Sequence, residues 1–167
     1  MKEEKTLSFT TVTPLGKILA AARGSALTGL WFIGQKYFPS GAEEWQSQPE
    51  HPVFAALKIW LGDYFARKKP KTKIPLAPQG TDFQKAVWEL LTEIPYGSTS
   101  TYGTLAARLS STGKKAAAQA VGGAVGHNPI SLLIPCHRVI GADGSLTGYA
   151  GGLDKKRALL EIEKGLA

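Results

Sequence analysis

The segment from Thr99 to Val125 reads TSTYGTLAARLSSTGKKAAAQAVGGAV, and it decides the fold of the second half of the chain. Its first part predicts a helix over 99–110, because apolar side chains recur at Leu105, Ala106 and Leu109 with the spacing of one helix face. The turn 111–113 follows, and a second helix is predicted over 114–125. Two short helices joined by a glycine-containing turn indicate a helix-turn-helix, a motif that docks on DNA.

The second of these helices is rich in alanine and glycine, which occupy positions 116–118, 120 and 122–124. Small residues let a helix pack closely against its neighbours, and composition alone favours this interpretation. They also let a helix enter a groove narrower than the major groove, such as the minor groove of DNA. The two interpretations stay open at this point.

Downstream, the apolar run Ser131–Ile134 predicts a short strand that leads into PCHRV at 135–139. Cys136 is the only cysteine, so no intramolecular disulfide can form and a cysteine-rich metal site is excluded. A lone cysteine is most often a small buried apolar residue. Here Pro135 fixes the path of the chain, and His137 and Arg138 adjoin the thiol, which favours a reactive cysteine instead.

A nucleophilic Cys136 needs a base or a positive field, because only a small fraction of a free thiol is ionised at neutral pH. His137 is the candidate base, oriented by a carboxylate as in a nucleophile–base–orienter triad. Glu163 and Glu161 are the candidates for that carboxylate. Neighbouring strand residues point to opposite faces, so we expect His137 to reach the sulfur through a bridging water.

The first half of the chain reads as a small α/β unit. Strands are predicted over 7–12, 16–22 and 26–32, then a polar loop over 35–49 and a helix over 51–67, with His51 at its start. The basic run 67–73 is expected to be a solvated linker rather than a phosphate clamp. Two further helices are predicted, one capped by Asp82 and one from Asp154 to Lys164.

These elements predict two domains. Residues 1–80 form an α/β N-terminal domain, a small antiparallel sheet with a helix, and residues 81–167 form a mainly α C-terminal domain that contains the helix-turn-helix.

Composition agrees with a folded chain that has a polyanionic partner. Of 167 residues, 43% are hydrophobic and 20% charged, which excludes a disordered chain. Twenty Lys and Arg against 13 Asp and Glu give a net charge of +7, which favours nucleic acid through counterion release. Apolar runs too short for a membrane span and an N-terminus without a secretory apolar core predict a protein of the reducing cytoplasm.

The hexapeptide IPCHRV at 134–139 resembles the active-site signature of the O6-alkylguanine-DNA alkyltransferases, the methylated-DNA–protein-cysteine methyltransferases. The resemblance runs from Phe83 to the C-terminus. Its other segments are FQKAVW at 83–88, IPYG at 94–97, YGTLA at 102–106, AVGGA at 120–124, Asn128-Pro129, GYAGGL at 148–153 and Leu159-Leu160. The first 80 residues are similar only in pattern to the family's N-terminal α/β domain.

The resemblance implies DNA repair by direct reversal of damage. The alkyl group of O6-alkylguanine, with O4-alkylthymine as a second candidate substrate, would pass irreversibly to Cys136, once per molecule. The target base would rotate out of the duplex, because its O6 cannot be attacked inside the stack. His137 would act through water as the base, Glu163 would orient it, and Tyr102 would supply a proton to the departing guanine.

The resemblance also implies substrate-binding positions. Backbone groups of Val139 and Ala150 would read the guanine edge, and Tyr149 would form a wall of the pocket. Asn128 would tie the DNA-binding helix to the active-site strand, and Arg138 is counted with the binding residues.

One position departs from the family. The arginine that usually fills the space left by the extruded base corresponds to Gln119, which can hydrogen-bond but lacks the charge and stacking plane of guanidinium. Lys114, Lys115 and Arg108 are candidates to compensate through phosphate contacts.

Neither an organic cofactor nor a metal is expected, although some relatives carry a structural zinc in the first domain. The expected partner is double-stranded DNA containing O6-alkylguanine, bound through the minor groove. The protein is expected to be a monomer, and cooperative binding of several monomers along DNA is a further expectation. Two rival classes remain open. One is a cysteine hydrolase that uses Cys136, His137 and Glu163 repeatedly; the other is a helix-turn-helix regulator or non-catalytic damage sensor with an incidental cysteine.

Overall fold

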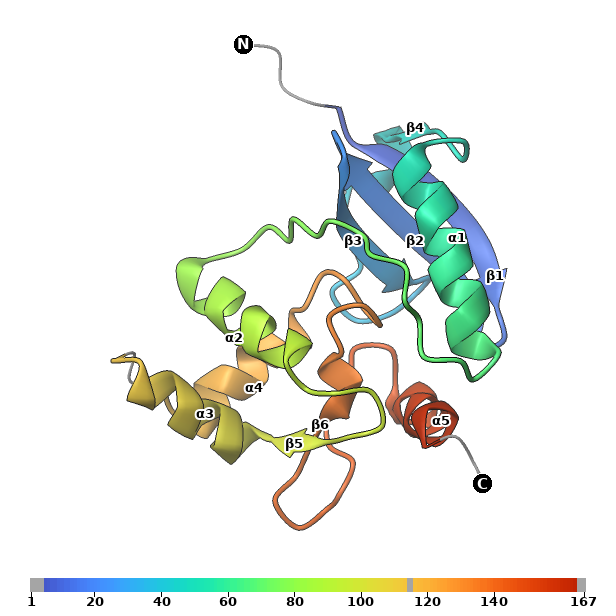
Figure 1. Ribbon diagram of the computed structural model, residues 1–167. Coiled ribbons are helices and arrows are strands. Elements are labelled where there is room, and N and C mark those ends of the chain that lie inside the picture. The colour runs from blue at the N-terminus through green and yellow to red at the C-terminus, as the bar shows by residue number, and fades with distance from the viewer. Residues whose placement is uncertain (1–4, 114–115, 165–167) are drawn as a thin grey trace.

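The first half of the chain folds as an antiparallel sheet covered by one helix. The computed structural model describes residues 5–113 and 116–164. Strands β1 (Leu7–Thr13), β2 (Gly16–Arg23) and β3 (Ala26–Phe32) pair antiparallel, and α1 (Pro52–Phe65) lies across one face of the sheet (Figure 1). Phe9 of β1 stacks on Phe54 of α1 with ring centroids 5.5 Å apart. The predicted antiparallel sheet with a helix is confirmed.

The segment between β3 and α1 is more ordered than its polar composition indicated. It contains a short 3-10 helix, η1 (Ala42–Glu44), and a two-residue strand, β4 (Gln46–Ser47), which pairs in parallel with β1. The sheet order is therefore β3-β2-β1-β4. A strand of two residues is too short to show the alternation of apolar and polar side chains that predicts a strand, so the sequence indicated only a loop.

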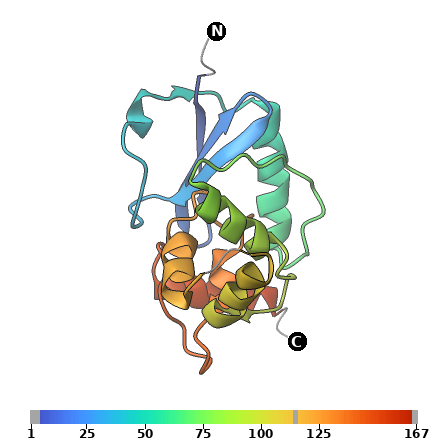
Figure 2. The same cartoon turned by 90° about the vertical axis from the view of Figure 1, so that its left-hand side faces the viewer.

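The second half is mainly helical, as predicted. Its elements are α2 (Asp82–Thr92), β5 (Ser100–Thr101), α3 (Tyr102–Ser111), α4 (Ala118–Gly126), the 3-10 helix η2 (Cys136–Arg138), β6 (Val139–Ile140) and α5 (Leu153–Glu163). Figures 1 and 2 show α2, α3 and α4 gathered below the sheet, with η2 between them and α5. Helices α3 and α4 are the predicted helix-turn-helix, with later starts than predicted.

The later starts have local causes. Ser100 and Thr101 pair in parallel with β6, and the Thr101 hydroxyl caps α3 by accepting from the Thr104 amide at 3.1 Å. Helix α4 begins at Ala118, and Lys114 and Lys115 lie outside the described residues. The cap of α2 is Thr81 in a capping box with Gln84, not Asp82 as predicted.

The helix ends of α1 and α5 are close to those predicted. His51 caps α1, because its Nδ1 accepts from the Val53 amide at 3.1 Å. Helix α5 begins one residue before Asp154, which lies in the first turn where its charge favours the helix dipole.

The predicted strand over 131–134 is wrong. The segment turns instead, with Leu132 in the left-handed region (φ 72) and the Ile134 amide bonded to the Ile130 carbonyl at 3.1 Å. It is attached to the sheet at one point, where the Leu30 amide donates to Pro129 and the Ser131 amide donates to Leu30, at 2.8 and 2.9 Å. This attachment fixes the start of the turn that ends in η2.

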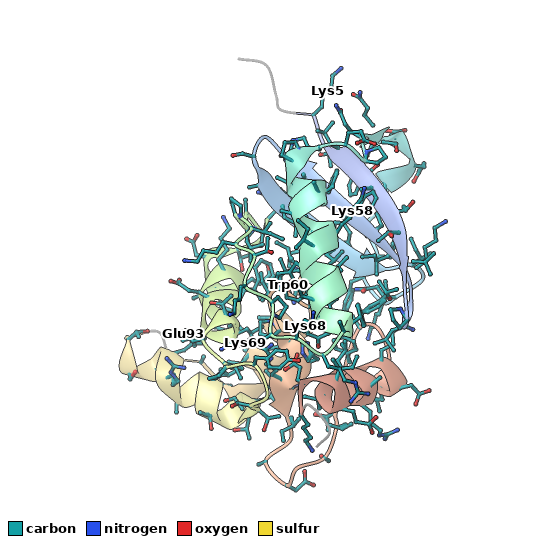
Figure 3. The ribbon with its side chains drawn as sticks, turned by 45° about the vertical axis from the view of Figure 1, so that its right-hand side comes forward. Lys5, Lys58, Trp60, Lys68, Lys69 and Glu93 are labelled. Atoms are coloured by element: carbon teal, nitrogen blue, oxygen red, sulfur yellow. The ribbon has the colours of Figure 1, made fainter. Side chains whose placement is uncertain are left out.

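The two halves share one hydrophobic core. Leu30 and Phe54 from the first half and Trp88, Leu105 and Leu159 from the second belong to a single cluster of buried side chains. Exposed basic residues follow α1 in the connecting segment, where Lys68 and Lys69 are seen in Figure 3, as expected for a solvated linker. None of the helices in the described residues has the length and apolar character needed to cross a membrane.

Candidate active site

Cys136 begins η2 and is buried next to the surface, with 8% of its area exposed. Burial raises the pKa of its thiol, while a hydrogen-bonding contribution from Asn128 and the charge of Lys156 act in the opposite direction. The thiol is therefore protonated in the resting protein, and it must lose its proton to become a nucleophile.

Asn128 fixes the turn that carries Cys136. Its side-chain amide donates to the Ile134 carbonyl at 2.7 Å and to the Ile130 carbonyl at 3.3 Å, while its oxygen accepts from the Ile130 amide at 3.0 Å. The residue follows α4 and is buried. It thus joins the end of α4 to the active-site turn, the tie that the sequence predicted, although the segment is a turn rather than a strand.

Glu163 is the centre of a buried polar network. Its Oε2 is hydrogen-bonded to His137 Nε2 and accepts from the Tyr64 hydroxyl at 2.7 Å. Its Oε1 accepts from Arg138 Nε at 2.7 Å and from the Gly97 amide at 3.3 Å. The alternative carboxylate, Glu161, is exposed. The structure therefore decides in favour of Glu163 as the partner of His137.

The network keeps Glu163 ionised and His137 neutral. Burial raises the pKa of Glu163, but hydrogen bonds and charges from His137 and Arg138 outweigh it and lower the pKa to about 2. Burial lowers the pKa of His137, against the opposing effect of Glu163. With Nε2 bonded to a carboxylate, Nδ1 is the basic nitrogen; it is buried and has no hydrogen-bond partner among the described residues.

Cys136 opens into a cavity of about 310 Å³ between α4, the loop before α5 and a loop of the first half. The predicted residues Tyr102, Asn128, Tyr149 and Ala150 line it together with Cys136. The Tyr102 hydroxyl donates to the Thr147 carbonyl at 3.1 Å. A nucleophile, a neutral base with its orienting carboxylate and an adjacent cavity form an arrangement for attack by a thiolate on a small group.

Comparison with known proteins agrees with this arrangement. The model of the 6-O-methylguanine DNA methyltransferase DNA-binding domain matches residues 82–165, and that of the family's ribonuclease-like domain matches residues 8–78. The chain belongs to the 6-O-methylguanine DNA methyltransferase family. The predicted family resemblance is confirmed, and it extends over the first half as well as the second.

Individual relatives of this methyltransferase family cover nearly the whole chain. The methylated-DNA–protein-cysteine methyltransferase of Haemophilus influenzae is 45% identical over 91% of this chain and 83% of its own. That of Methanosarcina barkeri is 46% identical over 91% of this chain and 93% of its own. The crystal structure of Mycobacterium tuberculosis OGT in complex with DNA is 43% identical, with a TM-score of 0.85, over 95% of this chain and 93% of that one.

Arg138 was predicted among the substrate-binding residues, but it does not line the cavity. Its guanidinium points inward, where Nη1 donates to the Ile94 carbonyl at 2.7 Å and Nε to Glu163. The residue is buried, and its ion pair with Glu163 holds that carboxylate in place. Val139 is also buried and pairs with Ser100 in the small β5–β6 sheet, outside the residues that line the cavity.

Two of the residues predicted for DNA contact, Gln119 and Arg108, lie outside the cavity. Gln119 is exposed in the first turn of α4. Arg108 is half-exposed and pairs with Glu93, at 3.0 Å, which lowers the charge it can offer to a phosphate. The predicted phosphate contacts of Lys114 and Lys115 concern positions outside the described part of the chain.

Sequence reasoning missed several site residues of this methyltransferase. Lys156 is fully buried in α5, and its ammonium group donates to the carbonyls of Thr147 at 2.7 Å and Gly148 at 3.2 Å. Burial lowers its pKa to about 8. In the sequence Lys156 is one of several charged residues. Only its spacing of three from Leu159 could have indicated that its side chain lies on the buried face of α5. Tyr64, from α1, donates to Glu163, although its apolar spacing in the sequence indicates only a core residue.

The first half also contributes to the cavity. Lys36 and Tyr37 line it. His127, which follows α4 in the second half, lines it as well, although the sequence supported no role for this residue. Within residues 5–113 and 116–164, no group of three or more His, Cys, Asp or Glu side chains is placed to hold a metal ion.

Proposed function

We propose that Cys136 is the acceptor in this protein's reaction, the transfer of an alkyl group from O6-alkylguanine in DNA to a cysteine. The class of reaction, DNA repair by alkyl transfer to a cysteine of the protein, follows from the family. Cys136 is the only cysteine in the chain, and it adjoins the His137–Glu163 pair and opens to the cavity. That conjunction is the observation that carries the proposal.

His137 removes the thiol proton in this mechanism. The imidazole is neutral because burial lowers its pKa, and Nδ1 is free because Glu163 engages Nε2. When Nδ1 takes the proton through a water molecule, the positive imidazolium is stabilised by the ionised carboxylate of Glu163. Arg138, Tyr64 and Gly97 hold that carboxylate in place.

The thiolate then attacks the alkyl carbon in line with its bond to O6. A sulfur–carbon bond forms, the carbon–oxygen bond breaks, and its electron pair stays with guanine. The departing base needs a proton, and Tyr102 is the proposed donor because it lines the cavity and carries a hydroxyl group that donates to the Thr147 carbonyl in the structure. The product thioether is stable, so each molecule acts once. This single turnover separates the proposal from a cysteine hydrolase.

Helix α4 is the proposed DNA-contacting helix, and the minor groove is its proposed site. A side-chain carbon added at Gly123 or Gly126 would meet no atom within 4 Å, and one added at Gly122 would be in ordinary contact with Tyr102. Packing within the protein therefore does not require these glycines, which favours the second interpretation of the small residues: a surface that fits a narrow groove. Exposed Gln119 and Ala120 extend that surface.

DNA is the partner of the family's DNA-binding domain, and the Mycobacterium tuberculosis OGT was crystallised in complex with DNA. Beyond this, we propose a monomer that acts in the cytoplasm, with domains over 1–80 and 81–167. Val139 and Ala150 are proposed to read the guanine edge through their backbone groups, with Tyr149 as a wall, and the lysines at 114 and 115 are proposed to contact phosphates.

Mass spectrometry tests the proposal directly. The protein is incubated with an excess of duplex oligonucleotide that contains one O6-methylguanine, and its tryptic peptides are then analysed. We expect one added methyl group per molecule, on the peptide that contains Cys136, and none on the Cys136→Ser variant. Methylation at another residue, or repeated repair by a substoichiometric amount of protein, would contradict it.

A further inference from the structure

The loop after β3 crosses from the first half of the chain onto the active-site cavity. The Lys36 amide donates a 3.0 Å hydrogen bond to the carbonyl of Ala150, which lies in the loop before α5. One residue later, the ring of Tyr37 stacks on the imidazole of His127, with centroids 3.9 Å apart and planes 25° from parallel. The first half of the chain therefore touches both sides of the cavity.

Lys36 and Tyr37 are the residues of the first half that line this cavity, among the parts of the chain that the structure describes. All the other lining residues, Cys136 and Tyr149 among them, belong to the second half. Tyr37 is 49% exposed, so its ring lies at the rim and not at the base. A large aromatic side chain at the rim narrows the opening through which a base must pass.

This rim is rigid. Tyr37 has a left-handed backbone (φ 62), which costs a residue with a side chain about 1 kcal/mol or more, so surrounding contacts must hold it. The Gln35 side chain provides two such contacts, accepting from the Phe32 amide at 2.9 Å and donating to the Lys36 carbonyl at 3.1 Å. The Lys36 ammonium group lies 5.1 Å from the centre of the Tyr37 ring.

We propose that Tyr37, supported by His127, is a specificity-determining residue that limits the size of the alkyl group admitted to Cys136. The inference rests on the proposed function. A planar purine with a small substituent can pass a fixed aromatic wall, whereas a bulky substituent meets it and must displace the stack on His127. The wall therefore selects against large alkyl groups and leaves methyl transfer nearly unaffected.

The test compares two lesions in the same duplex, O6-methylguanine and O6-benzylguanine, and measures the second-order rate constant of each by mass spectrometry. In Tyr37→Ala we expect the benzyl-to-methyl ratio of rate constants to rise about tenfold, the order of magnitude of one pocket contact. Tyr37→Phe keeps the ring and should keep the wild-type ratio. Ile59→Ala truncates another exposed apolar side chain, on α1 away from the cavity, and should also leave the ratio unchanged.

Tyr37→Gly controls for misfolding of Tyr37→Ala, because glycine adopts the positive φ of this position without strain. It should raise the ratio as Tyr37→Ala does. His127→Ala removes the support of the ring and should raise the ratio by a smaller factor. A ratio that stays constant or falls in both Tyr37→Ala and Tyr37→Gly overturns the inference. If the wild-type protein takes up neither alkyl group on Cys136, the proposed function itself fails, so the two failures are distinguishable.

Discussion

Tyr64 of α1 donates a 2.7 Å hydrogen bond to Glu163, the carboxylate that holds His137. The sheet half of the molecule therefore contributes directly to the active site. Burial and the negative charge of Glu163 raise the pKa of the Tyr64 hydroxyl, which favours the protonated form that donates to Glu163. Through this bond, the packing of α1 against the second half positions His137, the proposed base.

Tyr64→Phe should destabilise the protein, because it removes a hydrogen bond to a buried charge. We expect a loss of about 1.5–3 kcal/mol in the free energy of unfolding, measured in urea. The matched control is Tyr96→Phe, since the Tyr96 hydroxyl is buried without a partner among the described residues. Its loss should change stability by less than about 0.5 kcal/mol. Equal effects of the two substitutions would show that the bond to Glu163 contributes nothing.

Stability should depend on pH through Glu163. Its pKa in the folded protein is about 2, below the ordinary value of 4.5, so the folded state binds the proton more weakly than the unfolded chain. The resulting stabilisation is complete above pH 4.5 and is lost as the pH falls through 2. Urea unfolding between pH 2 and 6 should therefore show a decline that is smaller in Glu163→Gln, where the buried His137 still contributes to it. Exposed Glu161 is the control, and Glu161→Gln should decline like the wild type.

The sequence predicted the elements in which apolar residues recur at a regular spacing. It missed the segments whose conformation depends on a few individual hydrogen bonds. The three strands and the helices all have apolar residues at the spacing that burial of one face requires. The turn over 131–134 does not, because it depends on the Asn128 side chain and on one attachment to β3, at Leu30. An apolar run reads as a strand when such long-range hydrogen bonds are unknown.

The site shows the same division. Cys136, His137 and Glu163 could be predicted as candidates because the motif and the chemistry of a thiol indicate those residue types. The inward direction of Arg138 could not be predicted, because it depends on the Ile94 carbonyl, which is distant in the sequence. Tyr37 and His127 meet only through tertiary packing, so neither residue type signals the stack.

Lys156→Met should slow alkyl transfer without unfolding the protein. Methionine fills a similar volume but cannot donate to the carbonyls of Thr147 and Gly148, so the loop over the cavity loses its anchor. The charge that lowers the pKa of the Cys136 thiol is also removed, so this pKa should rise. We expect a rate constant at least about tenfold lower at pH 7. The pH at which the rate constant rises should also be higher than in the wild type.

The matched control for Lys156 is its neighbour. Lys155→Met makes the same change in charge, but the Lys155 ammonium group lies over the Phe32 ring, 5.5 Å from its centre, and not on the cavity loop. Its rate and pH profile should match those of the wild type. If both variants behave alike, net charge and not the anchor at Thr147 accounts for the effect.

Gln119→Arg should strengthen DNA binding. The side chain is exposed on α4, and arginine would add a positive charge and a stacking plane at the place from which the target base leaves. For a lesion-containing duplex, we expect the logarithmic salt dependence of the binding constant to steepen by about one unit. Fluorescence anisotropy over a salt series measures this. Glu43→Gln, on η1 in the first half, changes the net charge equally and should not alter the slope.

Methylation of Cys136 should destabilise the folded protein. The thiol is 8% exposed, directly after a turn that the Asn128 amide holds through the Ile134 carbonyl. An added methyl group must displace this turn or the wall of the cavity, and overpacking of this kind costs about 1–3 kcal/mol. For a chain of this size, that corresponds to a fall of several degrees in melting temperature, about 2–4 °C per kcal/mol.

Thermal unfolding before and after stoichiometric reaction with an O6-methylguanine duplex, with the DNA removed, measures the shift. Cys136→Ala treated in the same way should show none, and an unchanged or higher midpoint in the methylated protein would mean that the site accommodates the product without strain.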